Sequence, residues 1–124
     1  MTVNGNITAN TNGFAIGYRD IPQVSLSANA TTALTDAGKH YYSTSASNLT
    51  LTIANNSTVA FATGTALNVI NGGTANITIV PGTGVTMYLA GNTTSANRTL
   101  QSFGLATLIK VSTDTWFITG TGVN

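Results

Sequence analysis

Few residues in this sequence have side chains that can act as acids, bases or metal ligands. His40 is the only histidine, cysteine and glutamate are absent, and the carboxylates are Asp20, Asp36 and Asp114. The three aspartates lie far apart and lack the Asp-x-Asp spacing of a cation-binding loop. Without cysteine the chain has no disulfide and no Cys-based metal site. We therefore expect no catalytic residues, no cofactor and no bound metal.

Known catalytic patterns also fit this sequence poorly. A Ser–His–Asp triad would depend on His40, yet there is no Gly-x-Ser-x-Gly elbow, and Lys39-His-Tyr-Tyr42 is a predicted strand start. Polysaccharide cleavage uses a pair of carboxylates, which only the three aspartates could supply. Gly82-Thr-Gly84 and Gly120-Thr-Gly122 lack the strand–loop–helix context of a phosphate cradle, so we interpret them as turns.

The composition indicates a surface solvated mainly by uncharged groups. Charged residues make up 6% of the 124 residues, with a net charge of +1, whereas an average soluble domain has about 25%. Thr, Asn, Ser and Gly account for nearly half of the chain, and the 42% hydrophobic fraction is enough for a core. Four scattered Lys or Arg residues cannot form a phosphate-binding patch, and no segment has the pattern of a signal peptide or a bilayer span. We expect neither nucleic acid nor membrane as a partner.

Apolar residues alternate with Thr, Ser or Asn along most of the chain. Leu49, Leu51 and Ile53 alternate with threonines, which is the period of a strand with one buried face. Threonine suits such strands because its branched Cβ fits the pleated surface. We predict strands at about residues 14–18, 23–27, 39–43, 48–53, 59–62, 66–70, 75–80, 85–90, 105–111 and 115–119.

Turn residues separate these strands at short spacing. Asn71-Gly72-Gly73-Thr74 is the best hairpin signal, and residues 28–37 have room for a short helical turn. Asp36 is predicted to accept hydrogen bonds from the backbone of Ala37 or Gly38. The pattern predicts an all-β fold, a β-sandwich or small barrel of about ten short, mainly antiparallel strands. No internal repeat that would define a solenoid is visible.

The N-terminal residues 1–13 differ from the rest because they are rich in Asn and poor in large apolar side chains. We predict an N-terminal arm over 1–13 and one domain over 14–124. The arm has two interpretations, a frayed terminus or a segment that orders by adding to a neighbouring subunit. Arg19 and Asp20 likewise form either an exposed ion pair or a clamp between subunits.

Two adjacent aromatic residues near the C-terminus carry a further expectation. Trp116 and Phe117 cannot both point inward on one regular strand, because neighbouring side chains face opposite ways. One of them should therefore meet another sheet or another subunit. Exposed aromatics, with Tyr88 or Trp116 among them, would suit a sugar or a protein partner.

An ordered series of short motifs resembles the closing β-rich domain of tailed-bacteriophage tail-fibre and minor tail proteins. The resemblance covers about residues 14–124 and rests on Gly17-Tyr-Arg-Asp-Ile-Pro-Gln23, Leu34-Thr-Asp-Ala-Gly-Lys-His40, Val59-Ala-Phe-Ala-Thr-Gly-Thr65, Arg98-Thr-Leu, Ala106-Thr-Leu and Trp116-Phe-Ile-Thr-Gly-Thr-Gly122. It implies a virion component, commonly trimeric and without enzymatic activity, and it transfers no catalytic residue. The chain starts at Met1 with only a short arm before these motifs, which resembles the small free-standing decoration (cement) proteins of phage heads.

From this resemblance we expect a homotrimeric capsid decoration protein that stabilises the head. Its partners would be copies of itself and the major capsid protein, and it would be made in the bacterial cytoplasm and reside on the capsid surface. The alternative is a tail-fibre or tailspike-associated module that binds a host receptor glycan. We place Tyr18, Arg19, Ile21, Pro22 and Trp116 at subunit interfaces.

Overall fold

The computed structural model describes residues 7–8, 15–16 and 20–124, with side chains from residue 20 onward. This part of the chain is all-β, as predicted, and its two-residue strands β1 (Ile7–Thr8) and β2 (Ala15–Ile16) pair only with each other. A nine-stranded sheet contains everything else except the 3-10 helix η1 (Leu34–Asp36), which lies in the predicted helical segment. The nine strands are β3 (Gln23–Ser25), β4 (Ala30–Thr31), β5 (His40–Ser43), β6 (Leu49–Ile53), β7 (Ala66–Asn71), β8 (Ile77–Pro81), β9 (Thr86–Leu89), β10 (Arg98–Ser112) and β11 (Thr115–Val123).

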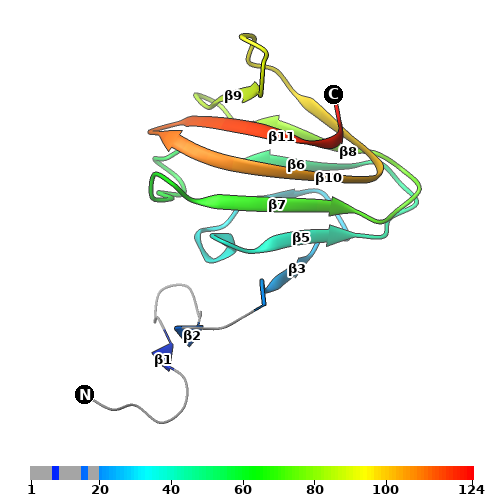
Figure 1. Cartoon of the computed structure of the whole chain (residues 1–124), viewed down its shortest axis with the longest axis horizontal. Helices are drawn as coiled ribbons and strands as arrows, with labels where there is room; N and C mark the ends of the chain where they lie inside the picture. The colour runs from blue at the N-terminus through cyan, green and yellow to red at the C-terminus, as the bar shows by residue number, and fades with distance from the viewer. Residues whose placement is uncertain (1–6, 9–14, 17–19) are drawn as a thin grey trace.

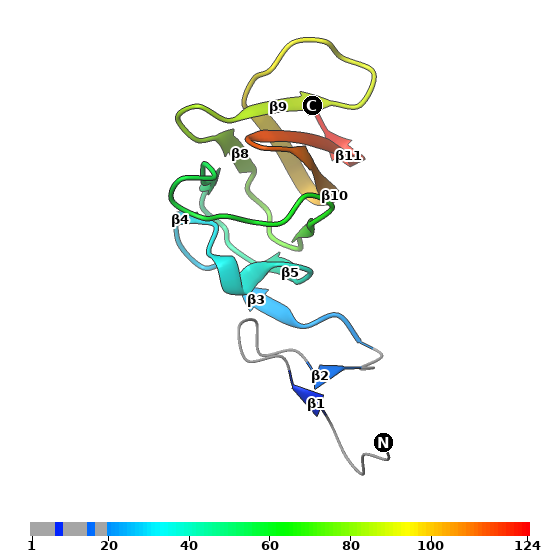
Figure 2. The ribbon, with the colours of Figure 1, turned by 90° about the vertical axis from the view of Figure 1, so that its left-hand side faces the viewer.

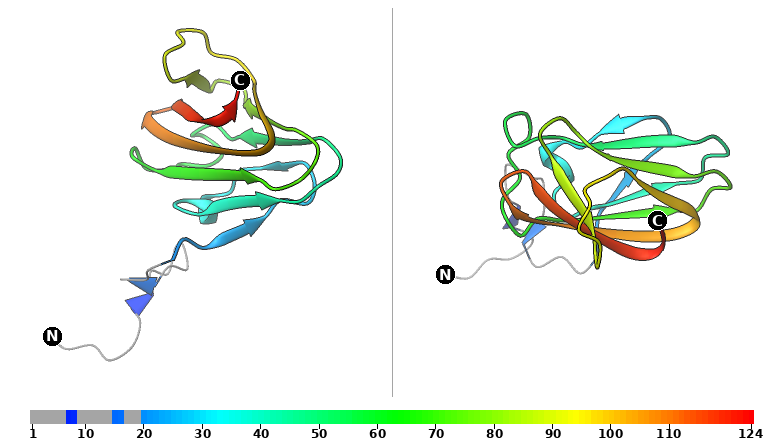
Figure 3. Two further views of the ribbon diagram at one scale, coloured as in Figure 1. Left: turned by 45° about the vertical axis from the view of Figure 1, so that its right-hand side comes forward. Right: turned by 90° about the horizontal axis from the view of Figure 1, so that it is seen from above.

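The chain winds as a coil of three turns. Odd strands β3, β5 and β7 stack in parallel on one side, and even strands β4, β6 and β8 stack in parallel on the other. Figure 1 shows the first stack in front, and Figure 3 shows the two layers from above. The sheet is curled like part of a barrel, as predicted, but the expectation of mainly antiparallel strands was wrong. Each turn of the chain contributes one strand to each layer, so consecutive strands from β3 to β8 face each other across the core and pair with strands of other turns.

The sequence shows no repeat that matches the coil, because the turns of the coil differ in length. Gln23 aligns with His40, and His40 aligns with Asn68, so the second turn is much longer than the first. The extra chain lies in the loop between β6 and β7, where a strand was predicted at residues 59–62. That segment is irregular in the structure, although Phe61 is buried in the core.

The predicted hairpin at Asn71 is a corner between the two layers. Strand β7 pairs with β5 and β10, whereas β8 pairs with β6 and β10. The Asn71 amide is buried and donates to the carbonyls of Ala75, Leu100 and Gln101 at 2.8, 3.2 and 3.1 Å, while its Oδ1 accepts from the Gly73 N–H. Buried polar side chains are retained where they satisfy backbone groups in this way. Asn71 thus holds the corner of the coil against β10.

Strand β10 closes the upper end of the coil (Figures 1 and 2). Its first residues pair with β8, and from Leu105 onward it pairs with β7, so one strand joins the two layers into a single sheet. β11 returns antiparallel to β10, and β9 lies parallel to β11 at the upper edge. The prediction placed the start of this strand at residue 105 and so missed the segment that bonds β8.

The core lies between the layers and below β10 and β11. It is built from inward-facing side chains at alternate strand positions, as the period of two predicted. Trp116 is its largest member, 1% exposed, and packs edge-on against Phe61 with ring centroids 5.6 Å apart. An aromatic contact of this geometry stabilises beyond the area it buries.

Candidate interaction surface

The outward side of β7, β11 and the later part of β10 is uncharged and carries most of the exposed large apolar side chains. We call it the apolar face and define it by Ile70, Leu105, Ile109, Val111 and Phe117, of which all but Ile70 are exposed. In strand register, Ile70 aligns with Leu105, and Ile109 aligns with Phe117. A polar row between them contains Asn68 and Thr107, joined by a 2.6 Å hydrogen bond. No Asp, Glu, Lys or Arg points outward from these three strands.

The basic residues of β10 point inward, which keeps the apolar face free of charge. Lys110 is 3% exposed, and its Nζ donates at 2.7 Å to both the Asn56 side chain and the Phe61 carbonyl. Arg98 is also buried and donates through Nη2 to the Thr94 carbonyl at 2.7 Å. These cations hold surrounding loops by hydrogen bonds to oxygen atoms. They are therefore structural groups and not part of a surface for a charged ligand.

The even layer presents a different surface, which we call the threonine face. Its outward side chains include Thr31, Thr50, Thr52, Thr78 and Thr99, and Thr50 aligns with Thr78, which in turn aligns with Thr99. Hydroxyl groups hydrogen-bond water while the branched side chains fit the strands. This face is solvated without charged groups.

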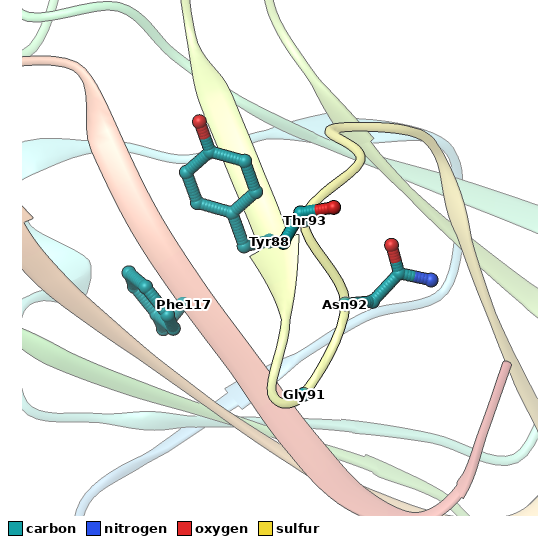
Figure 4. Close-up of a pocket in the computed structure, with 5 residues that line it drawn as sticks. All are labelled: Tyr88, Gly91, Asn92, Thr93 and Phe117. Atoms are coloured by element: carbon teal, nitrogen blue, oxygen red, sulfur yellow. The ribbon is translucent and has the colours of Figure 1, made fainter.

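A shallow aromatic pocket opens at the upper end of the apolar face. Tyr88, Gly91, Asn92, Thr93 and Phe117 line about 450 Å³, and the Tyr88 and Phe117 rings lie 5.5 Å apart at 55°. Figure 4 shows both rings on the same side, while the Asn92 and Thr93 side chains extend away from them. The Asn92 Oδ1 accepts from the Thr94 N–H at 2.8 Å. The rings therefore offer aromatic contact and few hydrogen-bonding atoms.

A second hollow lies lower on the same side of the molecule. Ile21, His40, Asn68, Ile70 and Leu105 line about 540 Å³. Ile21 is 53% exposed, and His40 Nε2 lies 3.1 Å from Gln23 Nε2. The predicted interface residue Ile21 is thus accessible and adjoins the apolar face.

Of the predicted interface residues near Ile21, the structure describes Pro22 but not Tyr18 or Arg19. Tyr18 and Arg19 lie outside the described residues, as does the predicted arm 1–13 apart from the backbone of Ile7–Thr8. Pro22 is half-buried, and its carbonyl accepts from the His40 N–H at 3.1 Å. Asp20 is exposed. The proposed Arg19–Asp20 pair therefore stays a prediction.

Trp116 is a correction to the predicted interface. Its side chain is in the core, because the strand period that separates it from Phe117 turns Trp116 inward and Phe117 outward. A side chain that is 1% exposed has no surface left for another subunit. Phe117, at 43% exposed, is the member of the pair that can contact a partner.

Asp36 and Asp114 have structural partners. Asp36 accepts from the Tyr41 hydroxyl at 2.6 Å and from the Ala33 N–H at 2.8 Å, so the predicted bonds to Ala37 or Gly38 are replaced by a tie between η1 and β5. Burial, and then the hydrogen bond to Asp36, raise the pKa of the Tyr41 hydroxyl far above its usual range. Asp114 accepts from the Asn56 N–H at 2.6 Å. Within the described residues, no three His, Cys, Asp or Glu side chains gather as a metal site.

Most of the apolar face was not predicted from the sequence. Leu105, Ile109 and Val111 belong to the run Phe103-Gly-Leu-Ala-Thr-Leu-Ile-Lys-Val111, in which apolar residues occupy both sides of the strand. A strand that is apolar on both sides is covered on both sides, by its own chain or by another. This run therefore indicates that the part of β10 from Leu105 to Val111 has apolar side chains on its outer side as well as its inner side.

No protein-family model matches this chain, and no curated protein matches it significantly. Among the described residues, no helix is long and apolar enough to cross a membrane.

Proposed function

We propose that this chain is a non-enzymatic structural protein of a bacteriophage virion, a homotrimer that decorates and stabilises the capsid. The apolar face is the observation that carries the proposal. Ile109 and Phe117 align on neighbouring strands, Val111 follows along β10 and Leu105 lies beyond the polar row, and all four are exposed, as at protein interaction sites. The phage assignment itself rests on the resemblance of the sequence motifs.

A second copy of the chain is the occupant that we assign to the apolar face. The face is uncharged, and the whole chain has only 6% charged residues, so a copy of itself presents a surface of matching chemistry. Contact between two uncharged surfaces avoids the cost of removing ions from water. The threonine face stays hydrated and is free to face solvent or the capsid shell.

Quantitative mass spectrometry of purified virions tests this function. We expect a copy number comparable to that of the major capsid protein. A few copies per particle would move the protein to the tail, and its absence from virions would overturn the proposal.

The second candidate function is host-receptor binding by a tail-fibre module. The half-buried Tyr88 ring and the exposed Phe117 ring favour it, because aromatic rings stack on sugar rings. The Asn92 and Thr93 side chains extend away from the rings and offer little to sugar hydroxyls (Figure 4). Binding of purified protein to host cells, lost in Tyr88→Ala, would support this function, and failure of the wild-type protein to bind would count against it.

A further inference from the structure

Phe103 is the most exposed large hydrophobic side chain of the described residues. Its exposed fraction is 80%, and its backbone has φ = 61°, a left-handed conformation that residues with a Cβ rarely adopt. Such conformations persist where surrounding contacts impose them, and they gather at functional sites. Phe103 therefore has both an unfavourable backbone conformation and an apolar ring exposed to water.

The surrounding contacts fix the direction of this ring. Phe103 lies in the irregular part of β10, between the residues that pair with β8 and those that pair with β7. Just before it, the Leu100 and Gln101 carbonyls accept from the Asn71 amide, and the Ser102 hydroxyl donates to the Gly73 carbonyl. Bulges of this kind re-aim a side chain. Here the bulge holds an aromatic ring out from the coil.

We propose that the Phe103 ring of one protomer inserts into the Tyr88–Phe117 pocket of the next protomer. This inference rests on the proposed homotrimer and names the contact that would hold it together. The pocket, of about 450 Å³, has room for a benzyl group and lines it with two aromatic rings. Aromatic rings favour tilted or edge-on contact with one another.

The ring and the pocket lie too far apart to meet within one chain. Leu105, just beyond Phe103, aligns with Thr121, whereas the pocket residue Phe117 aligns with Ile109. Four strand residues span roughly 13 Å. A projection and a hollow at different places on one chain produce a head-to-tail interface, which closes as a ring when the rotation allows. In a trimer with three such contacts, every Phe103 ring is inserted in a pocket and every pocket is filled.

The second hollow, which Ile21 lines, is a poorer receptor for Phe103. His40 and Asn68 place polar groups in it, which an inserted benzyl group would cover. The aromatic pocket is lined entirely by described residues and has no ionisable group other than the Tyr88 phenol.

The variant Phe103→Gly separates this role from a structural one. Glycine adopts positive φ without strain, so we expect the folded chain to keep or gain thermal stability. Removal of the ring should nevertheless lower the trimer association constant at least tenfold in sedimentation velocity. Leu34→Ser, which removes another exposed large hydrophobic, is the matched control and should leave association unchanged.

Complementation tests the direction of the contact. Phe103→Asp removes the inserted ring and Phe117→Asp places a charge in the pocket, so each variant alone should be monomeric with a native circular dichroism spectrum. Mixed together, they retain one intact ring–pocket pair, and we expect a 1:1 heterodimer. A wild-type trimer whose Phe103→Gly variant associates equally well would overturn this inference alone. A monomeric wild-type chain would overturn the proposed homotrimer as well.

Discussion

The apolar face and the threonine face cover the same core from opposite sides, yet they present different groups. Thr50, Thr78 and Thr99 align across the even layer, while Ile109 and Phe117 align across β10 and β11. Both faces are uncharged, and both belong to strands whose other side is in the core. Strand formation therefore does not require the side chains of the apolar face, because threonine supports the same strand conformation on the other face. Those groups are instead suited to a partner.

The largest expected effect comes from a negative charge on the apolar face, compared with the same charge on the threonine face. Ile109→Asp puts a carboxylate in the proposed interface, and an unpaired buried charge costs several kcal/mol. We expect it to weaken association by on the order of 4 kcal/mol, enough to convert trimer to monomer at micromolar concentration in sedimentation velocity.

Thr52→Asp is the matched change on the threonine face. It should leave association unchanged within about 0.5 kcal/mol, because Thr52 lies on the surface outside the proposed interface. Equal loss of association in both variants would mean that the two faces do not differ in function.

The next effect distinguishes the inner and outer sides of β11. Trp116→Ala removes the largest core side chain and should lower the free energy of unfolding by about 3–5 kcal/mol. Phe117→Ala, on the exposed side, should lower it by less than about 1 kcal/mol and act mainly on association. Chemical denaturation, at protein concentrations at which the chains are monomeric, measures both free energies of unfolding. Similar losses in the two variants would contradict the assigned orientation.

The smallest expected effect concerns the core that both faces share. The Tyr41 hydroxyl stays protonated in the folded chain at a pH where it ionises in the unfolded chain, because burial raises its pKa. Stability from this group is therefore complete below about pH 10 and falls as the pH rises above it.

Tyr41→Phe should remove that alkaline loss, at a cost near neutral pH of about 1 kcal/mol for the hydrogen bond to Asp36. Denaturation midpoints between pH 7 and 11 test this, and an unchanged alkaline slope in the variant would refute it. Trimer association at neutral pH serves as the control and should not change.

Local patterns predicted the strands, but not how they connect. The alternation at Leu49–Ile53 and Ile77–Pro81 was found because burial on one face leaves a period of two. The parallel coil was not, because its turns vary in length and each strand pairs with one that is distant in sequence. Asn-Gly-Gly at residues 71–73 has the composition of a hairpin, and only the burial of Asn71 against β10 makes it a corner.

The candidate surface was predictable in part for a similar reason. Strand periodicity requires Trp116 and Phe117 to point in opposite directions, but it does not say which one faces the core. Packing against Phe61 decides this in favour of Trp116. The exposure of Phe103 depends on an irregularity in β10 that arises from pairing with two different strands, which no local pattern encodes.

Sedimentation equilibrium of the full-length wild-type chain tests the central claim, self-association through the apolar face, most directly. We expect a molar mass of three times the chain mass of 12.7 kDa at micromolar concentration, and a return to the chain mass in Ile109→Asp. A wild-type protein that sediments at the mass of a single chain over the whole concentration range would contradict it.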